Sequence, residues 1–143
     1  MKKSGFTLVE ILVVVTIISL LASIAALSYS RFIKQSRDTR RKTDIEQVRA
    51  AVELYRNFNS VYPASLLFDG TGTVADGTAT YMSKVPSDPL ASGPLSTTYY
   101  YLSSGTFQDY VVCAYLEGGE TTSIVAACGS QSCNYCMGPY GQK

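Results

Sequence analysis

The stretch that decides the fold is MKKSGFTLVE at residues 1–10, followed by ILVVVTIISLLASIAALSYS at residues 11–30. The second part holds no charged residue, no glycine and no proline. Twenty helical residues span about 30 Å, the thickness of the hydrocarbon core of a bilayer. The sequence therefore predicts one uninterrupted apolar helix that is long enough to cross a membrane.

Three interpretations of this start compete. Lys2 and Lys3 before the apolar run suit a cleaved secretory signal, and the run also suits a permanent single-span anchor. In the third, cleavage precedes the run and the helix stays on the mature protein. Glu10 favours the third, because a carboxylate beside an apolar run is costly unless it lies at the membrane interface or has a partner. A cut between Gly5 and Phe6 would create an amino group four residues before Glu10, and in a staggered bundle the amine of one copy can neutralise Glu10 of another.

The run from Lys2 to Glu10 resembles the leader and cleavage motif of type IV prepilins and pseudopilins. These families have a short basic leader, glycine before the cut, phenylalanine after it and glutamate at the fifth mature position. The resemblance implies that a prepilin peptidase cuts after Gly5 and N-methylates Phe6, and that Glu10 guides docking into a growing filament. It also implies separate proteins for the peptidase and the inner-membrane assembly platform.

The implied fold class is α+β, the type IV pilin fold, in which a long amino-terminal helix packs against a small antiparallel sheet of about three strands. Ile45, Val48, Val52 and Tyr55 recur at spacings of three and four, which predicts an apolar stripe on a helix ending near Asn59. We expect a leader at 1–5, a transmembrane or filament-core helix at 6–30, an amphipathic stem helix at 31–60, and a globular head with a disulfide-stapled tail at 61–143.

Two features depart from the family pattern. Position 27 is Leu27, where many members carry a helix-bending proline. Six basic residues follow the span against two in the leader, so the positive-inside rule would reverse the orientation that the peptidase requires. They are Arg31, Lys34, Arg37, Arg40, Arg41 and Lys42. Those from Arg37 to Lys42 can be solvated, meet acidic heads of other copies, or bind lipid phosphates or DNA; we favour the first two.

Charge and composition narrow the function. The formal net charge of +1 argues against a general nucleic-acid binder. Residues 31–56 hold eight basic and four acidic side chains, whereas residues 57–143 hold two and six. A basic stem and an acidic head would suit packing between copies, or be two ordinary solvated surfaces. The chain has no histidine, the commonest general base and metal ligand. We expect a protein that is not an enzyme and that has no cofactor and no metal site.

The head combines loops with short strands. Residues 69–80, DGTGTVADGTAT, are spaced too loosely for a calcium loop, and an exposed loop is the better interpretation. The run from Lys84 to Pro89 contains Pro86-Ser87-Asp88-Pro89, which resembles a turn that precedes the sheet in secretion-type pseudopilins. Tyrosine- and valine-rich runs predict three antiparallel strands, at 98–103, 108–116 and 121–127.

The four cysteines, Cys113, Cys128, Cys133 and Cys136, all lie in the last 31 residues and suit an oxidising exterior compartment. Two disulfides would pin a tail that has no periodic pattern. We favour Cys113–Cys128 with Cys133–Cys136, and the alternatives that join Cys113 to Cys133 or Cys136 stay open. A redox or zinc site at Cys133-x-x-Cys136 is disfavoured, because no second cysteine pair and no histidine accompany it.

Three functions remain. The leading one is the structural subunit of an extracellular type IV pilus, a helical homopolymer that is membrane-inserted as a precursor and supports adhesion, twitching motility or DNA uptake. The first alternative is a pseudopilin of a type II secretion-like system, towards which the Pro86–Pro89 turn leans. The second alternative is a bitopic anchored binding module with an uncut helix.

Overall fold

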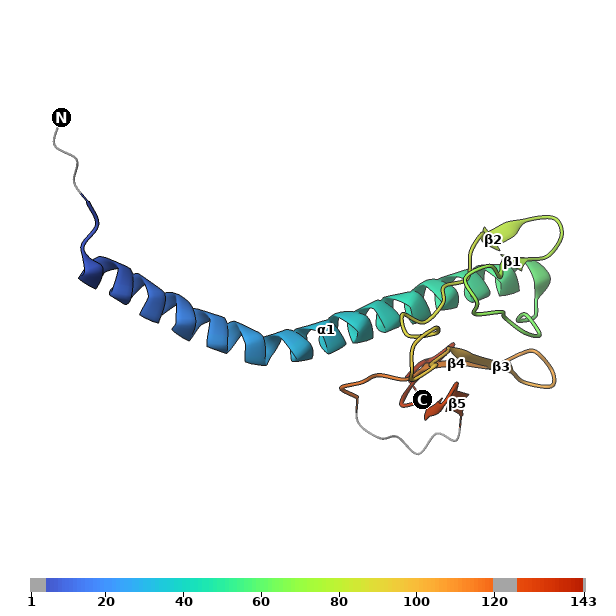
Figure 1. Ribbon diagram of the computed structural model, residues 1–143. Helices are drawn as coiled ribbons and strands as arrows, with labels where there is room; N and C mark the ends of the chain where they lie inside the picture. The colour runs from blue at the N-terminus through green and yellow to red at the C-terminus, as the bar shows by residue number, and fades with distance from the viewer. Residues whose placement is uncertain (1–4, 120–125, 143) are drawn as a thin grey trace. The chain divides into compact units, whose positions relative to one another are not determined.

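The computed structural model describes residues 5–119 and 126–142, with the Leu27 side chain excepted. The chain divides into two compact units, residues 1–35 and residues 36–143, and the helix α1 (Leu8–Asn59) runs through both. Figure 1 shows α1 as the one long helix of the described chain. The backbone is helical at position 27, where the family pattern places a proline.

Local contacts explain both ends of α1. At the start, the Thr7 hydroxyl accepts a hydrogen bond from the Glu10 N–H at 3.2 Å, and Glu10 accepts one from the Thr7 N–H at 2.8 Å. This reciprocal pair is a capping box. At the end, Ser60 has a φ of 62° and donates its N–H to the Arg56 carbonyl at 2.7 Å, which closes the last turn in a left-handed conformation. The helix thus ends where the sequence predicted.

The first unit presents its apolar side chains outward. Val13 is 47% exposed and Leu20 64%, and an 18-residue window of the helix reaches a mean hydropathy of 2.7 with none of it buried. By length and composition this segment can cross a membrane. None of the described residues of this unit covers it.

The second unit has its core on one face of α1. Ile45, Val48 and Val52 are each fully buried, which confirms the predicted stripe. They belong to one apolar cluster with residues of the head: Tyr62, Phe68, Val74, Val85, Tyr99, Tyr110, Val112 and Ala114. At about 25 cal/mol per Å² of buried apolar area, such side chains supply the main force that attaches the head to the helix.

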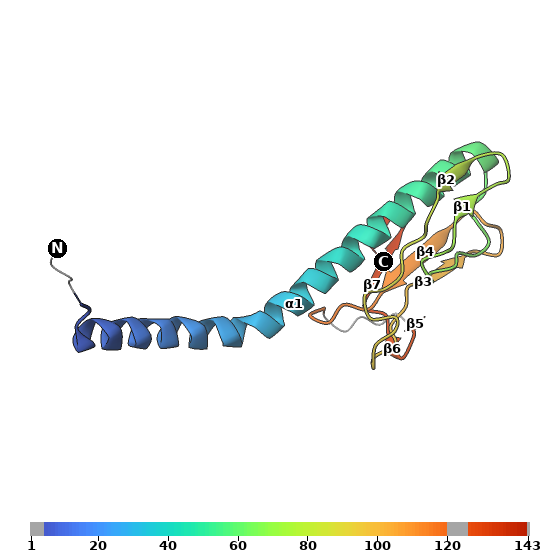
Figure 2. The same cartoon turned by 45° about the horizontal axis from the view of Figure 1, so that its top comes forward.

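The main sheet has four antiparallel strands in the order β3-β4-β7-β8. Their bounds are β3 (Tyr100–Ser103), β4 (Tyr110–Ala114), β7 (Tyr135–Gly138) and β8 (Gly141–Gln142). Figure 2 shows β3, β4 and β7 lying beside the second half of α1. Two small two-stranded sheets complete the head: β1 (Val74–Ala75) with β2 (Thr80–Met82), and β5 (Ala127–Cys128) with β6 (Gln131–Ser132).

The fold class is confirmed, with a different set of strands. Two predicted strands correspond to β3 and β4, both shorter than expected. Of the predicted third strand at 121–127, residues 121–125 lie outside the described residues, and Ala127 begins β5, which belongs to a small sheet. The third strand of the main sheet is instead β7, from the tail that showed no periodic pattern. The sequence Tyr-Cys-Met-Gly of β7 has no polar residue, so no alternation of apolar and polar side chains marks it as a strand.

The segment at residues 69–80 is ordered by its two aspartates. Asp69 accepts hydrogen bonds from the backbone N–H groups of Thr71 and Gly72, and Asp76 accepts from those of Thr78 and Ala79. These are turn-stabilising contacts of the kind that aspartate commonly makes. In the described part of the chain, no group of three or more acidic, cysteine or histidine side chains is placed to hold a metal ion.

Candidate functional site

The amino-terminal residues that we predict to be processed lie before the helix begins. Gly5 and Phe6 are outside α1, and the Phe6 side chain is 83% exposed. A Cβ added at Gly5 would meet no atom within 4 Å. A peptidase needs an accessible chain at the bond that it cuts, and both Gly5 and Phe6 are exposed.

Glu10 is held by hydrogen bonds from its own chain that were not among the predictions from the sequence. Its carboxylate accepts hydrogen bonds from both the N–H and the hydroxyl of Thr7, at 2.8 and 2.9 Å. The pattern Thr7-x-x-Glu10 would have signalled this capping box. Among the described residues, no cationic group forms an ion pair with Glu10. Within the described part of the chain, the carboxylate is therefore oriented but not neutralised.

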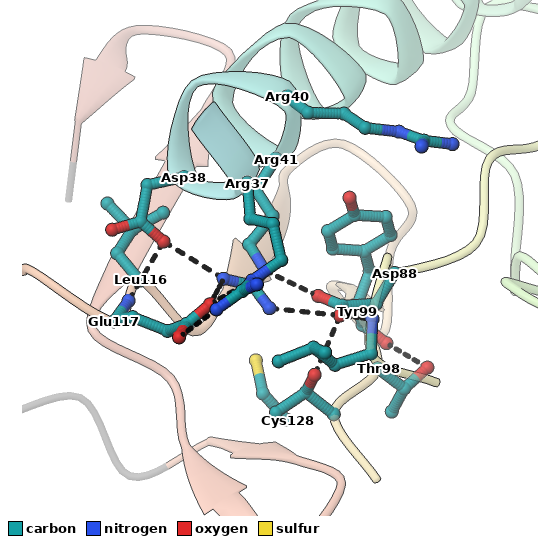
Figure 3. A network of polar contacts seen from close by, with 12 residues as sticks. Arg37, Asp38, Arg40, Arg41, Asp88, Thr98, Tyr99, Leu116, Glu117 and Cys128 are labelled. Carbon is teal, nitrogen blue, oxygen red and sulfur yellow. Dashed lines mark hydrogen bonds and ion pairs between the residues drawn. The ribbon is translucent and has the colours of Figure 1, made fainter. Parts of the chain in front are cut away.

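The second polar site lies where α1 meets the head, and we call it the Arg41 cluster: Arg37, Asp38, Arg41, Asp88 and Glu117. The Arg41 side chain is fully buried. Its guanidinium contacts Asp88 twice, at 2.8 and 3.1 Å, and donates to Asp38 at 2.9 Å and to Glu117 at 3.1 Å. Arg37 donates to both carboxylate oxygens of Glu117, at 2.6 and 2.7 Å, and shares Oε1 with Arg41. Figure 3 shows these contacts converging on Arg41, while Arg40 points away from them.

The carboxylates of this cluster also hold backbone groups of the head. Asp38 accepts the N–H groups of Glu117 and Gly118, both at 2.9 Å. Asp88 accepts the N–H of Leu90 and the hydroxyl of Thr97, both at 2.7 Å. A buried ion pair is stable only when such additional bonds satisfy its remaining lone pairs. The cluster therefore fixes two head loops to one turn of the helix.

The same contacts shift the pKa values of the two head carboxyls. Burial alone would raise the pKa of Asp88, but the hydrogen bonds from Arg41 and Thr97 outweigh it, and the pKa falls below its usual value. The hydrogen bond from Arg37 is the largest influence on Glu117 and lowers the pKa of that carboxyl, against a smaller effect of burial. Both groups are thus ionised at neutral pH.

The Arg41 cluster changes the interpretation of the basic stem. Arg37 and Arg41 were grouped with side chains free to meet solvent or other copies, yet they pair with Asp88 and Glu117 of the same chain. The complementarity of basic stem and acidic head is thus used within one subunit at these residues. A signal was visible in the sequence, because Arg41 lies four residues before Ile45 and so continues the buried stripe.

The disulfides join Cys113 to Cys136 and Cys128 to Cys133, so the favoured pairing is wrong and one of the open alternatives is right. Cys113 and Cys136 lie directly opposite each other on β4 and β7. Cys128 ends β5 and Cys133 directly follows β6, so their disulfide closes the β5–β6 hairpin. All four are at most 1% exposed. The error follows from β7, since without that strand the partner of Cys113 could not be placed.

Comparison of the sequence with known proteins shows the family to which the chain belongs. The prokaryotic N-terminal methylation motif matches residues 1–26. Type II secretion system core protein G of Pseudomonas aeruginosa is 33% identical over 117 residues, covering 73% of this chain and 77% of the relative. The protein of the same description from Vibrio cholerae is 31% identical over 133 residues, covering 85% and 88%. A probable minor fimbrial protein of Dichelobacter nodosus is 39% identical over 92 residues, covering 64% and 47%. No solved structure matches the chain.

Motif and fold together define a class: proteins with an amino-terminal methylation motif and a long helix that is apolar in its first half and packs against a small head of antiparallel strands. The chain belongs to the type IV pilin and pseudopilin family. Members of this family are structural subunits and not enzymes. Membership implies self-polymerisation and processing by a prepilin peptidase, and the apolar helix fits insertion into a membrane.

Proposed function

We propose that this chain is the structural subunit of an extracellular type IV pilus. It is cut after Gly5, N-methylated at Phe6 and polymerised through its amino-terminal helix. The observation that carries the proposal is the outward-facing apolar surface formed by the described side chains of residues 11–30, with the oriented carboxylate of Glu10 at its start. A surface of this kind requires a partner outside the chain.

Two partners cover that surface at different stages. In the precursor, the membrane covers it, because the uncharged run matches the thickness of the hydrocarbon core. In the filament, helices of other copies take the place of lipid. The new amine on Phe6 of one copy then pairs with Glu10 of another, which neutralises two charges in a medium of low dielectric constant. Thr7 keeps the carboxylate oriented until that amine arrives.

The orientation follows from the processing step. The leader faces the cytoplasm, where the peptidase reaches it, and residues 61–143 lie outside the inner membrane before the subunit is extracted into the pilus. The described structure reduces the charge conflict, because Arg37 and Arg41 are neutralised in the folded unit by Asp38, Asp88 and Glu117. The division into leader (1–5), core helix (6–30), stem (31–60) and head (61–143) is part of this proposal.

The task of such a filament is a further part of the proposal. Adhesion, twitching motility and DNA uptake are the activities that the family resemblance implies. Two of the six basic residues that follow the span are held inside the Arg41 cluster, which leaves a smaller basic face for DNA. An inner-membrane assembly platform is the expected partner for extraction in each case.

A pseudopilin of a type II secretion system is the second candidate. It is favoured by the two relatives described as core protein G, which align over 77% and 88% of their own length and therefore include part of the head. Asp88 of the Pro86–Pro89 turn also has a structural use, since it binds Arg41. The tail favours the pilus, because two buried disulfides suit a head exposed outside the cell. A bitopic anchored module would need an uncut leader.

Electron microscopy of sheared surface fractions tests the proposal. Long filaments that contain this chain are expected, and their absence from a strain that makes the processed protein would favour the secretion pseudopilin. Glu10→Ala should leave subunits that are processed but not assembled. The matched control is Glu46→Ala, which removes an exposed carboxylate elsewhere on α1. A normal filament yield from Glu10→Ala would contradict the charge-pairing role.

A further inference from the structure

The end of the apolar segment carries a cluster of side chains that the assembly mechanism does not use. We call it the girdle: Tyr29, Arg31, Phe32 and Lys34. Tyr29 is 67% and Phe32 66% exposed, and Arg31 and Lys34 are exposed as well. All four belong to the unit that ends at residue 35.

The girdle has a basic side and an aromatic side. Arg31 and Lys34 are three residues apart and so are neighbours on the helix surface, about 5–6 Å apart at their Cβ atoms. Tyr29 and Phe32 have the same spacing. At about 100° per residue, the aromatic pair lies nearly opposite the basic pair. One phosphate group can therefore contact both cations, while the rings cover another side of the helix.

The two cations have no partner in the described chain. Neither Arg31 nor Lys34 forms an ion pair with a described residue, in contrast to Arg37 and Arg41. The one acidic residue before residue 36 is Glu10, which precedes Arg31 by about 30 Å of helix. The charges are thus available to an external anion.

Position along the chain identifies that anion. Arg31 is the first charged residue after the uncharged span of residues 11–30, so it lies where the hydrocarbon core ends and the headgroup layer begins. Tyrosine is enriched at this level of membranes, where its ring meets the headgroups. Basic side chains next to a span attract anionic lipids. Charge complementarity and continuity with the span both point to lipid phosphate.

We propose that the girdle is a binding site for anionic phospholipid, in which Arg31 and Lys34 together hold one lipid phosphate. This inference rests on the membrane-inserted precursor of the proposed function. The site sets the depth of the helix in the bilayer, and its lipid must be released when the subunit enters the filament. Each basic side chain should raise the preference for anionic over zwitterionic lipid by roughly fivefold.

Electron spin resonance on the full chain in phosphatidylethanolamine vesicles tests the site. Spin-labelled phosphatidylglycerol and spin-labelled phosphatidylethanolamine report how many lipids of each kind the protein restricts. The wild type should prefer phosphatidylglycerol by roughly 25-fold, because each of the two cations contributes about fivefold, and Arg31→Gln with Lys34→Gln should bring the ratio close to one. The control, Lys42→Gln with Lys84→Gln, removes two exposed charges from the unit that begins at residue 36 and should keep the preference.

Several outcomes would overturn the site. They are an unchanged ratio in Arg31→Gln with Lys34→Gln, an equal loss in the control, and displacement of the lipid by inorganic phosphate but not by chloride at equal ionic strength. If the double variant lost its filaments but kept the lipid preference, the result would show that these two cations contact a second copy of the chain and not a lipid. Membrane recovery is measured separately. A chain that inserts without lipid preference refutes only the girdle, whereas a chain that does not insert refutes the proposed function too.

Discussion

The two halves of α1 have the same backbone conformation and opposite surroundings. In the first half, Ile18 is 54% exposed and Leu21 61%. In the second half, Ile45 and Val48 are fully buried, and even the charged Arg41 has no exposed surface. The first half carries apolar residues on all sides, whereas the second carries them on one stripe. A helix that is apolar all round needs partners on all sides, and a striped helix needs one.

The difference shows which contacts belong to folding and which to assembly. The stem half is completed by the head of its own chain, so changes there should alter the stability of the subunit. The apolar half is not covered by any described residue of its own unit, so changes there should alter insertion or polymerisation and leave the head stable. Each prediction below tests one side of this division.

The largest effect is expected at Arg41. Arg41→Ala leaves Asp88 and Glu117 without their shared cation, and breaking a buried pair in this way costs about 3–5 kcal/mol of unfolding free energy. Arg40→Ala is the matched control, since its side chain is 65% exposed and lies 3.9 Å from its nearest carboxylate. We expect that change to cost at most about 1 kcal/mol. Urea unfolding in detergent micelles, followed by the near-ultraviolet signal of the head tyrosines, measures both. Equal losses would contradict the role of the Arg41 cluster.

The second prediction compares an isoleucine-to-alanine substitution in the two halves of α1. Ile45→Ala opens a cavity in the core and should cost about 3 kcal/mol. Ile18→Ala removes the same atoms from an exposed position, so we expect the head to keep its stability within about 0.5 kcal/mol. The same unfolding measurement applies. Destabilisation of the head by Ile18→Ala would mean that the first half has a partner within its own chain.

The smallest predicted effect is a loss of stability of the folded unit at acid pH. The pKa values of Asp88 and Glu117 are lowered in the folded state, so their contribution is fully present above the unfolded pKa values of about 3.9 and 4.3. It is lost as the pH falls below about 4, through the folded values. Thermal unfolding measured in steps from about pH 6 to about pH 2 should show this loss of stability. The slope should be shallower in Asp88→Asn with Glu117→Gln, and an identical slope would exclude these carboxyls as its source.

Much of this division was visible in the sequence. An uncharged run of twenty residues and an apolar stripe at spacings of three and four depend only on local chemistry. The apolar helix from Ile11 and the buried stripe up to Val52 were both predicted correctly. The helix end near Asn59 was also local, because it is set by the residues from Asn57 to Pro63. Periodicity is informative for such long elements.

The missed features depend on contacts between distant residues. Arg41 and Asp88 are 47 positions apart, and a charged side chain on a helix is ordinarily solvated, so the pair was not anticipated. Strand β7 has four residues and pairs with a strand more than twenty positions earlier. The disulfide pairing depended on β7, because Cys136 lies on that strand opposite Cys113. The missed strand therefore also explains the wrong disulfide pairing. The capping of Glu10 by Thr7 was local and could have been found.

The central claim is that the apolar half is freed by a cut after Gly5 and completed by other copies. The most direct test is mass spectrometry of the intact protein from sheared surface filaments, without reduction. We predict a chain of residues 6–143 that carries one methyl group on Phe6 and two disulfides, Cys113–Cys136 and Cys128–Cys133. A chain that still begins at Met1 would contradict the account.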